Sequence, residues 1–222
     1  MQDQIEVARS LLSSDPNQVT RTQLWQFTRD ICSILGFHPS RRRGQHFLVS
    51  PEILRCLLYN ANLTSNDIIL EIGGGIGTLS LFLASRVKKL IIIEQDPRLI
   101  EILSILLKNT NNVLILRGDA CKLDWPPFDK LVSNLPYQIS SPIALKLLGK
   151  QFSSAIITFQ FEFANRLLAF AGDPEYSRIS VQSNLFFDTE MLLRIGKEAF
   201  FPAPKVNSAI VKITPRKNAS GI

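Results

Sequence analysis

The sequence predicts a doubly wound α/β fold with a mostly parallel seven-stranded sheet that ends in an antiparallel hairpin. Short apolar runs alternate with segments of helical spacing over residues 67–171, which is the pattern of βαβ units. The last two apolar runs have no helical segment between them, so they are expected to pair as the hairpin. Ligands of such sheets bind at the carboxyl ends of the strands, so the site residues are sought there.

Each element is expected at a definite place in the chain. Strands are expected at 67–72, 90–93, 113–116, 130–133, 154–159, 190–195 and 208–213. Helical spacing follows at 79–87, 97–107, 142–148 and 162–171. Two amphipathic segments, split by Asp15-Pro16-Asn17, precede this pattern. We therefore divide the chain into a helical N-terminal appendage (1–40), an α/β domain (41–216) and a tail (217–222).

Length, composition and charge limit the classes of protein to which the chain can belong. The chain has 222 residues, of which 45% are hydrophobic, so it can bury a core. No apolar stretch is long enough to span a membrane, no signal peptide is evident, and the three cysteines fit no zinc pattern. We expect a cytoplasmic monomer with no metal and no membrane partner. The net charge of +6 favours a polyanionic partner, and Arg41–Arg43 form either a binding cluster or a solvated basic turn.

A glycine-rich loop, Glu71-Ile72-Gly73-Gly74-Gly75-Ile76-Gly77, follows the first strand of the α/β pattern. Its glycines allow a sharp turn and a close approach of the backbone to a ligand, although an ordinary strand-to-helix turn is the alternative. Glu94 ends the second strand about 20 residues later, where a carboxylate can bind ribose hydroxyls. Asp119 follows the third strand, where it can accept a hydrogen bond from an adenine amino group.

S-adenosylmethionine is the cofactor that this arrangement favours. The dinucleotide fingerprint G-x-G-x-x-G would need a glycine where Thr78 stands, and the sequence contains no G-x-x-x-x-G-K-[ST] loop. S-adenosylmethionine has no phosphates, so the helix N-terminus need not face an anion. The residues expected to bind it are Gly73, Gly75, Gly77, Glu94 and Asp119, together with Asn134 after the fourth strand.

Asn134-Leu135-Pro136-Tyr137, after the fourth strand, is the most specific motif. The motif suits the methylation of an aromatic amine such as N6 of adenine. This nitrogen is a poor nucleophile because its lone pair is delocalised into the ring. The side-chain oxygen of Asn134 and the carbonyl of Leu135 can accept both N6 hydrogens and stabilise the developing charge. Pro136 stiffens the turn, and Tyr137 offers a ring on which an extruded base can stack. Taken alone, the motif could be a β-turn with a packed tyrosine.

In the order of these motifs the chain resembles the KsgA-type rRNA adenine N6-dimethyltransferases, a family that includes the Erm methyltransferases. The likeness runs from about Arg43 to Pro215. It implies a Rossmann-like class I S-adenosylmethionine-dependent methyltransferase fold. It also implies methyl transfer to N6 of adenosines in small-subunit rRNA, on two adjacent adenosines near the 3′ end, within an assembling ribosomal particle.

Other segments extend the resemblance. Gly44-Gln45-His46-Phe47-Leu48 is similar to the family's G-Q-[NH]-F-L, which implies cofactor contacts from Gln45, His46 and Leu48, whereas His46 alone would more often be structural. Phe200-Phe201-Pro202-Ala203-Pro204-Lys205-Val206-Asn207-Ser208 is similar to F-x-P-x-P-K-V-x-S. It implies that Phe200 is a second aromatic wall opposite Tyr137, for which core packing is the alternative. Gln160–Leu167 and Tyr176–Val181 also resemble family segments.

The chain departs from the family pattern in three places. Gly74 stands where a proline is usual, which is expected to loosen the loop slightly. The helical segments of residues 1–40 have no counterpart in the pattern. The helical C-terminal domain of the family is expected to be absent or truncated here, so the surface that grips RNA is expected around Arg41–Arg43, Lys146, Lys150 and Lys205.

Rival functions differ in the residues that they need. An Erm-type enzyme acting on large-subunit rRNA is the nearest alternative. A DNA adenine methyltransferase would more typically carry D-P-P-Y or N-P-P-Y. A non-catalytic assembly or transcription factor with this fold would not need Glu94, Asp119 and Asn134. A small-molecule methyltransferase would not need the aromatic pair of Tyr137 and Phe200.

Overall fold

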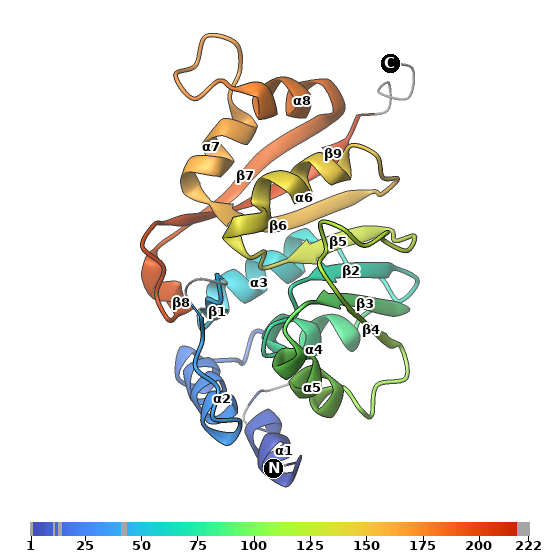
Figure 1. The fold of residues 1–222 in the computed structure, drawn as a ribbon, viewed down its shortest axis with the longest axis vertical. Coiled ribbons are helices and arrows are strands. Elements are labelled where there is room, and N and C mark those ends of the chain that lie inside the picture. The colour runs from blue at the N-terminus through green and yellow to red at the C-terminus, as the bar shows by residue number, and fades with distance from the viewer. Residues whose placement is uncertain (1, 11, 13–14, 41–43, 217–222) are drawn as a thin grey trace.

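The computed structural model describes residues 2–10, 12, 15–40 and 44–216. Its main sheet has seven strands in the order β4-β3-β2-β5-β6-β9-β7 (Figure 1). Neighbouring strands from β4 to β6 run parallel, and β9 is antiparallel to both β6 and β7. The predicted fold class is confirmed. The strands are β2 (Ile68–Ile72), β3 (Lys89–Glu94), β4 (Val113–Arg117), β5 (Lys130–Ser133), β6 (Ser154–Gln160), β7 (Phe187–Ile195) and β9 (Ser208–Pro215).

Side chains alternate between two apolar layers because successive residues of a strand face opposite sides of the sheet. In β3, Leu90 and Ile92 belong to one buried cluster, and Ile91 and Ile93 belong to the other. The first layer contains helices α3 (Pro51–Asn60), α4 (Thr78–Ala84) and α5 (Pro97–Leu106). The second contains α6 (Ser140–Leu147) and α7 (Phe161–Leu168). Both faces of the parallel strands are therefore covered, as such sheets require.

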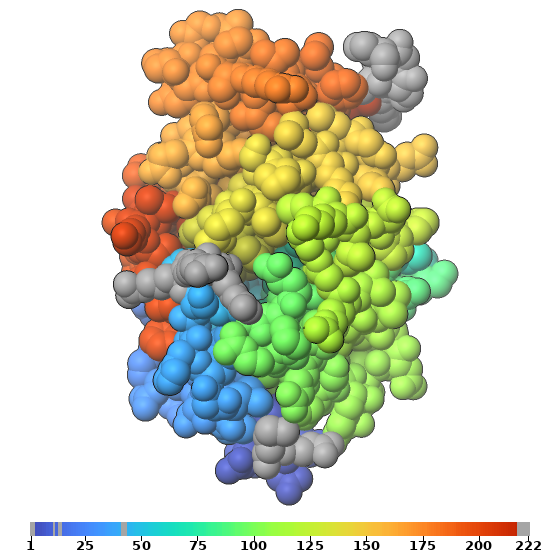
Figure 2. Space-filling view, in the orientation of Figure 1, coloured from blue at the N-terminus to red at the C-terminus, as the bar shows by residue number. Residues whose placement is uncertain are grey.

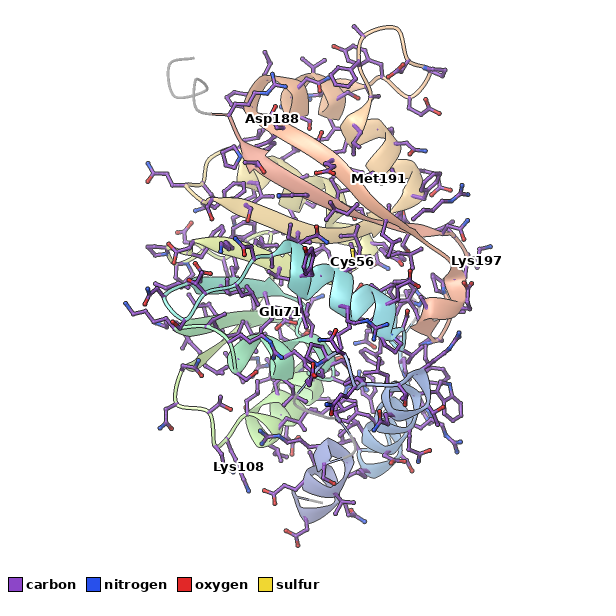
Figure 3. All side chains as sticks on the ribbon, turned by 180° about the vertical axis from the view of Figure 1, so that it is seen from behind. Cys56, Glu71, Lys108, Asp188, Met191 and Lys197 are labelled. Carbon is purple, nitrogen blue, oxygen red and sulfur yellow. The ribbon has the colours of Figure 1, made fainter. Side chains whose placement is uncertain are left out.

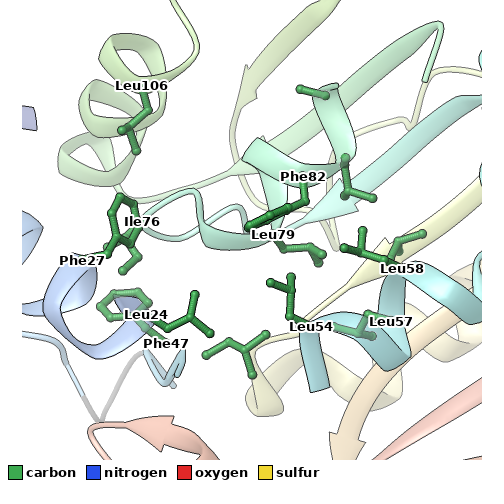
Figure 4. Packing of buried hydrophobic residues seen from close by; sticks show 14 of the residues in the cluster. Leu24, Phe27, Phe47, Leu54, Leu57, Leu58, Ile76, Leu79, Phe82 and Leu106 are labelled. Atoms are coloured by element: carbon green, nitrogen blue, oxygen red, sulfur yellow. The ribbon is translucent and has the colours of Figure 1, made fainter. Parts of the chain in front are cut away.

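Two further helices precede the α/β pattern, α1 (Gln2–Ser10) and α2 (Arg21–Ile34). Leu24, Phe27 and Ile31 of α2 are fully buried in the first layer. Figure 4 shows Leu24 and Phe27 close to Phe47 and Ile76, which come from the α/β domain. The two helices thus share the core of that domain, and the boundary after residue 40 stays a prediction.

Three features were not expected from the sequence. Helices α3 and α8 (Arg178–Phe186) lie in segments for which no helix was predicted. A separate two-stranded sheet pairs β1 (Phe47–Leu48) with β8 (Phe200–Phe201), Phe47 opposite Phe201 and Leu48 opposite Phe200. This pairing brings the segment Gly44–Leu48 against the segment that begins at Phe200.

Within the described residues, no helix combines the length and the apolar character needed to cross a bilayer. The same residues contain no group of three or more His, Cys, Asp or Glu side chains that could hold a metal ion. The three cysteines are free.

Candidate active site

The glycine loop after β2 follows the conformation that its composition predicts. Gly73, Gly75 and Gly77 have φ values of +78°, +57° and +84°, which side chains rarely tolerate. A Cβ on Gly73 would lie 2.9 Å from Cδ of Pro136, and one on Gly75 would lie 3.3 Å from the ring of Phe47. The loop is therefore held against both the tetrapeptide after β5 and strand β1.

A cavity opens between this loop, β1 and the carboxyl ends of β3 and β5. It holds about 650 Å³ of space between its walls, open solvent included. Five predicted site residues are not among its described lining residues: Gly77, Asp119, Leu135, Tyr137 and Phe200. The predicted site residues that line it are Gln45, His46, Leu48, Gly73, Gly75, Glu94, Asn134 and Pro136.

The carboxylate of Glu94 is fixed at the cavity wall. It is 7% exposed, and its oxygens accept the backbone N–H groups of Gly75 at 3.1 Å, Gln95 at 2.8 Å and Asp96 at 3.0 Å. Burial raises the pKa of Glu94, and the three N–H groups oppose that shift. A buried acceptor at the end of β3 suits a ligand that donates hydroxyl groups, as ribose does.

Asp96 was missed in the sequence and anchors the segment Gly44–Leu48. Asp96 is 2% exposed. It accepts a hydrogen bond from Nε2 of Gln45 at 3.0 Å and forms an ion pair with Arg98 at 2.8 Å. The Arg98 hydrogen bond keeps the pKa of Asp96 below its ordinary value. The signal available in the sequence was its position before Pro97, where an aspartate caps α5.

Glu71, the first residue of the glycine motif, is a buried acid. Its side chain is 1% exposed and accepts the hydroxyl of Ser80 at 2.6 Å. Burial raises its pKa to about 8, and the Ser80 hydrogen bond lowers it in part. Figure 3 shows Glu71 in the interior of the molecule. Glu71 lines the cavity, and its raised pKa favours the neutral carboxyl form there.

The tetrapeptide follows β5 as predicted, and Asn134 is held by its amide nitrogen. Nδ2 of Asn134 donates to the carbonyl of His46 at 3.2 Å, which turns Oδ1 away from that carbonyl. Ser133, just before it, donates from Oγ to the carbonyl of Ile72 at 2.7 Å and joins β5 to β2. The amide oxygen is thus oriented by a hydrogen bond to another segment of the site.

The aromatic environment of Tyr137 differs from the expected pair. The ring of His46 stacks on Tyr137, with centroids 5.7 Å apart and planes 24° apart. His46 is itself fixed, because its Nδ1 donates to the carbonyl of Pro202 at 2.6 Å. Phe200 is 3% exposed and packs in the first apolar layer. Its role as a wall for a substrate base stays a prediction.

Asp119 and Lys146 both form hydrogen bonds with the backbone of the loop that follows β4. Oδ1 of Asp119 accepts the N–H of Cys121 at 2.9 Å. The ammonium of Lys146 donates to the carbonyls of Ala120 and Cys121 at 3.1 and 3.2 Å, and to that of Leu123. Lys146 therefore anchors the loop after β4, and its place on an RNA surface stays a prediction. The expected basic cluster Arg41–Arg43 lies outside the described residues.

The family model described as ribosomal RNA adenine dimethylase matches residues 37–220. The chain belongs to this family. Among its relatives, a protein of Pyrococcus abyssi named "Probable ribosomal RNA small subunit methyltransferase A" is 46% identical over 191 residues, 85% of this chain and 70% of that protein. One of the same name from Thermococcus kodakarensis is 47% identical, over 82% of this chain and 64% of the relative.

Two solved structures are similar to this chain in both sequence and fold. A dimethyladenosine transferase from Plasmodium falciparum superimposes with a TM-score of 0.74 at 40% identity, over 78% of this chain and 65% of that one. The 23S rRNA methyltransferase ErmE gives a TM-score of 0.70 at 30% identity, over 77% and 70%. The family predicted from the motifs and the class I methyltransferase fold are both confirmed. The chain spans about two thirds of the length of these relatives.

Proposed function

We propose that this protein transfers methyl groups from S-adenosylmethionine to N6 of adenosines in small-subunit rRNA, dimethylating two adjacent adenosines during ribosome assembly. The observation that carries the proposal is the orientation of Asn134, whose amide nitrogen is occupied by the carbonyl of His46 at 3.2 Å. Its oxygen is left to accept a hydrogen from an amine. The names of the Pyrococcus and Thermococcus relatives support the small subunit as the source of the RNA.

The cofactor is assigned to the cavity between β1, β3 and the glycine loop. The buried carboxylate of Glu94 suits the ribose hydroxyls, and the positive φ of Gly75 permits a close approach of the backbone. Gln45, held by Asp96, closes one side of the cavity. Asp119, which follows β4 and is not among the described lining residues, is kept as the candidate acceptor for the adenine amino group. When bound, S-adenosylmethionine supplies an electrophilic methyl group.

The residues of the tetrapeptide act on the substrate amine. Oδ1 of Asn134 and the carbonyl of Leu135 accept its two hydrogens, which localises the lone pair on the nitrogen and stabilises the positive charge that develops there. Tyr137, already packed against His46 on one side, offers its ring to the extruded base. No strong base is required, because the nitrogen becomes acidic when it carries the charge.

An Erm-type activity on large-subunit rRNA is the second candidate, and the similarity to ErmE favours it. Both candidates are tested by incubating labelled S-adenosylmethionine with unmethylated small subunits and, separately, with large subunits. Label in small-subunit RNA supports the proposal, and label only in large-subunit RNA supports the Erm-type activity. No label in either RNA, from a protein that binds the cofactor, contradicts both.

A further inference from the structure

One exposed side of α2 carries an aromatic ring between two arginines. Arg21, Trp25 and Arg29 are spaced four residues apart and therefore lie along one side of the helix. Trp25 is 39% exposed, and the guanidinium of Arg29 lies over its ring, 4.7 Å from the centroid. Arg21 donates to the carbonyl of Glu198 at 2.7 Å. We call these three residues the α2 stripe.

The α2 stripe is continuous with the wall of the cavity. Trp25 meets Phe201 of β8 edge to face, with centroids 6.4 Å apart and planes 69° apart. Phe201 is directly opposite Phe47 in the β1–β8 pair, so the two side chains lie on one face of that sheet. Phe47 lines the cavity. Figure 2 shows the blue surface of α2 and the segment after it bordering the red surface near residue 200.

The chemistry of the α2 stripe fits a single-stranded polyanion with flat bases. Aromatic side chains stack on bases of any sequence, and arginine binds phosphate through charge-assisted hydrogen bonds. Asp30, the acidic residue of α2, already accepts a hydrogen bond from Gln26 at 2.8 Å. An apolar partner protein would have to desolvate both guanidinium groups, which is costly without paired anions.

We propose that the α2 stripe binds the RNA strand beside the target adenosine, with a flanking base stacked on Trp25 and neighbouring phosphates on Arg21 and Arg29. The inference rests on the proposed function, since RNA is its substrate. It adds a substrate contact from residues that precede the family match, which begins at residue 37. It also gives α2 a function beyond its contribution to the core.

Binding of an rRNA fragment that carries the target adenosines tests the inference in the full chain. Replacing Trp25 by alanine is expected to raise the Kd for this RNA about 5- to 100-fold, because one base loses its stacking partner. The rate at saturating RNA and the affinity for S-adenosylmethionine are expected to be unchanged. Trp25→Phe keeps a ring and is expected to retain most of the affinity. Tyr59→Ala, at a tyrosine that is 85% exposed on α3, is the matched control.

Two further readouts separate RNA contact from a structural role of Trp25. The chain has two tryptophans, of which Trp125 is buried. RNA is therefore expected to quench the tryptophan fluorescence of the wild type and not that of Trp25→Phe. Arg29→Gln is expected to reduce the slope of log affinity against log salt by about 1. It keeps the helix intact and so tests the inference even if Trp25→Ala unfolds.

Unchanged RNA affinity in Trp25→Ala and an unchanged salt slope in Arg29→Gln would overturn the inference. If the wild type still methylates small-subunit rRNA in that case, the proposed function stands without the α2 stripe. Failure of the wild type to methylate any rRNA would instead overturn the proposed function, and with it the inference built on it.

Discussion

The hydroxyl of Tyr137 lies 2.5 Å from the hydroxyl of Ser208 and joins the tetrapeptide after β5 to the first residue of β9. Ser208 is fully buried, and the ring of His46 packs against Tyr137. Three segments that are distant in the sequence thus hold one ring at the site. Ser208 belongs to the segment that resembles P-K-V-x-S, and the structure gives that residue a partner.

If Ser208 positions Tyr137 through this hydrogen bond, the two side chains act as one unit. Ser208→Ala and Tyr137→Phe are each expected to lower kcat/KM for RNA about 3- to 10-fold, the usual worth of one hydrogen bond. The double variant is expected to be no worse than either single variant, because the same bond is lost. Additive losses in this cycle would contradict the assignment.

The matched control for Ser208→Ala is Ser183→Ala. Ser183 is 1% exposed, and its Oγ has no hydrogen-bond partner within the part of the chain that the structure describes. Removing it from α8 is expected to leave kcat/KM unchanged. A loss as large as that of Ser208→Ala would point to a general effect on folding.

Asn134 is the residue on which the proposed chemistry depends. Asn134→Ala removes the acceptor for the substrate amine and is expected to lower kcat at least about 100-fold. The Kd for S-adenosylmethionine, measured by calorimetry, is expected to change only a few-fold. Asn184→Ala is the control, since it also removes a side-chain bond to a backbone carbonyl, that of Ala169, but in α8. Retained activity in Asn134→Ala would argue against this mechanism.

The raised pKa of Glu71 leads us to expect that the stability of the protein depends on pH. Its pKa in the folded protein, about 8, lies above the ordinary value of 4.5. Its contribution to stability is therefore full below about pH 4.5 and is lost as the pH rises through about 8, when a buried group must ionise. Glu71→Gln cannot ionise and can still accept the Ser80 hydroxyl.

Urea unfolding between pH 5 and pH 9 tests this expectation. The unfolding free energy of Glu71→Gln minus that of the wild type is expected to increase from pH 5 upward and to level off above about pH 8, where Glu71 is ionised in both states. Glu94, the acidic neighbour that also raises the pKa of Glu71, is present in both proteins, so its own titration largely cancels. Parallel stability curves for the two proteins would mean that Glu71 is not protonated at neutral pH.

The space around Gly74 is filled by neighbouring side chains. A Cβ there would lie 2.6 Å from Cγ2 of Ile92 and 2.9 Å from Cδ1 of Leu103, both of which are buried. Gly74→Ala is therefore expected to lower the unfolding free energy by about 1–3 kcal/mol through overpacking. Gly149→Ala, where a Cβ would have no heavy atom within 4 Å, is the control. Equal stabilities of the two variants would contradict this account.

Apolar runs were sufficient to predict all seven strands of the main sheet. The signal is strongest in β2 and β3, which are parallel and almost completely buried. Helix α8 gave no such signal, since Val181 and Leu185 are exposed and its buried residues include Ser180 and Ser183. Helix α3 begins with Pro51 after Ser50, which is a helix start signal in the sequence.

The parts of the site that lie within one sequence motif could be predicted. The contacts between segments that are distant in the sequence could not. The glycine loop, Glu94 and Asn134 lie at the strand ends that the sequence indicates. The stacking of His46 on Tyr137 depends on the two-residue β1–β8 pair, whose strands are too short to leave a periodic pattern. The contact of Trp25 with Phe201 likewise joins segments with no sequence relation to each other.

The most direct test of the central claim is to identify the methylated nucleoside. Unmethylated small ribosomal subunits are incubated with S-adenosylmethionine and either the wild type or Asn134→Ala, and their RNA is digested to nucleosides for mass spectrometry. The account predicts N6,N6-dimethyladenosine with the wild type and none with the variant. Methylation at any other atom, or equal product from both proteins, would contradict it.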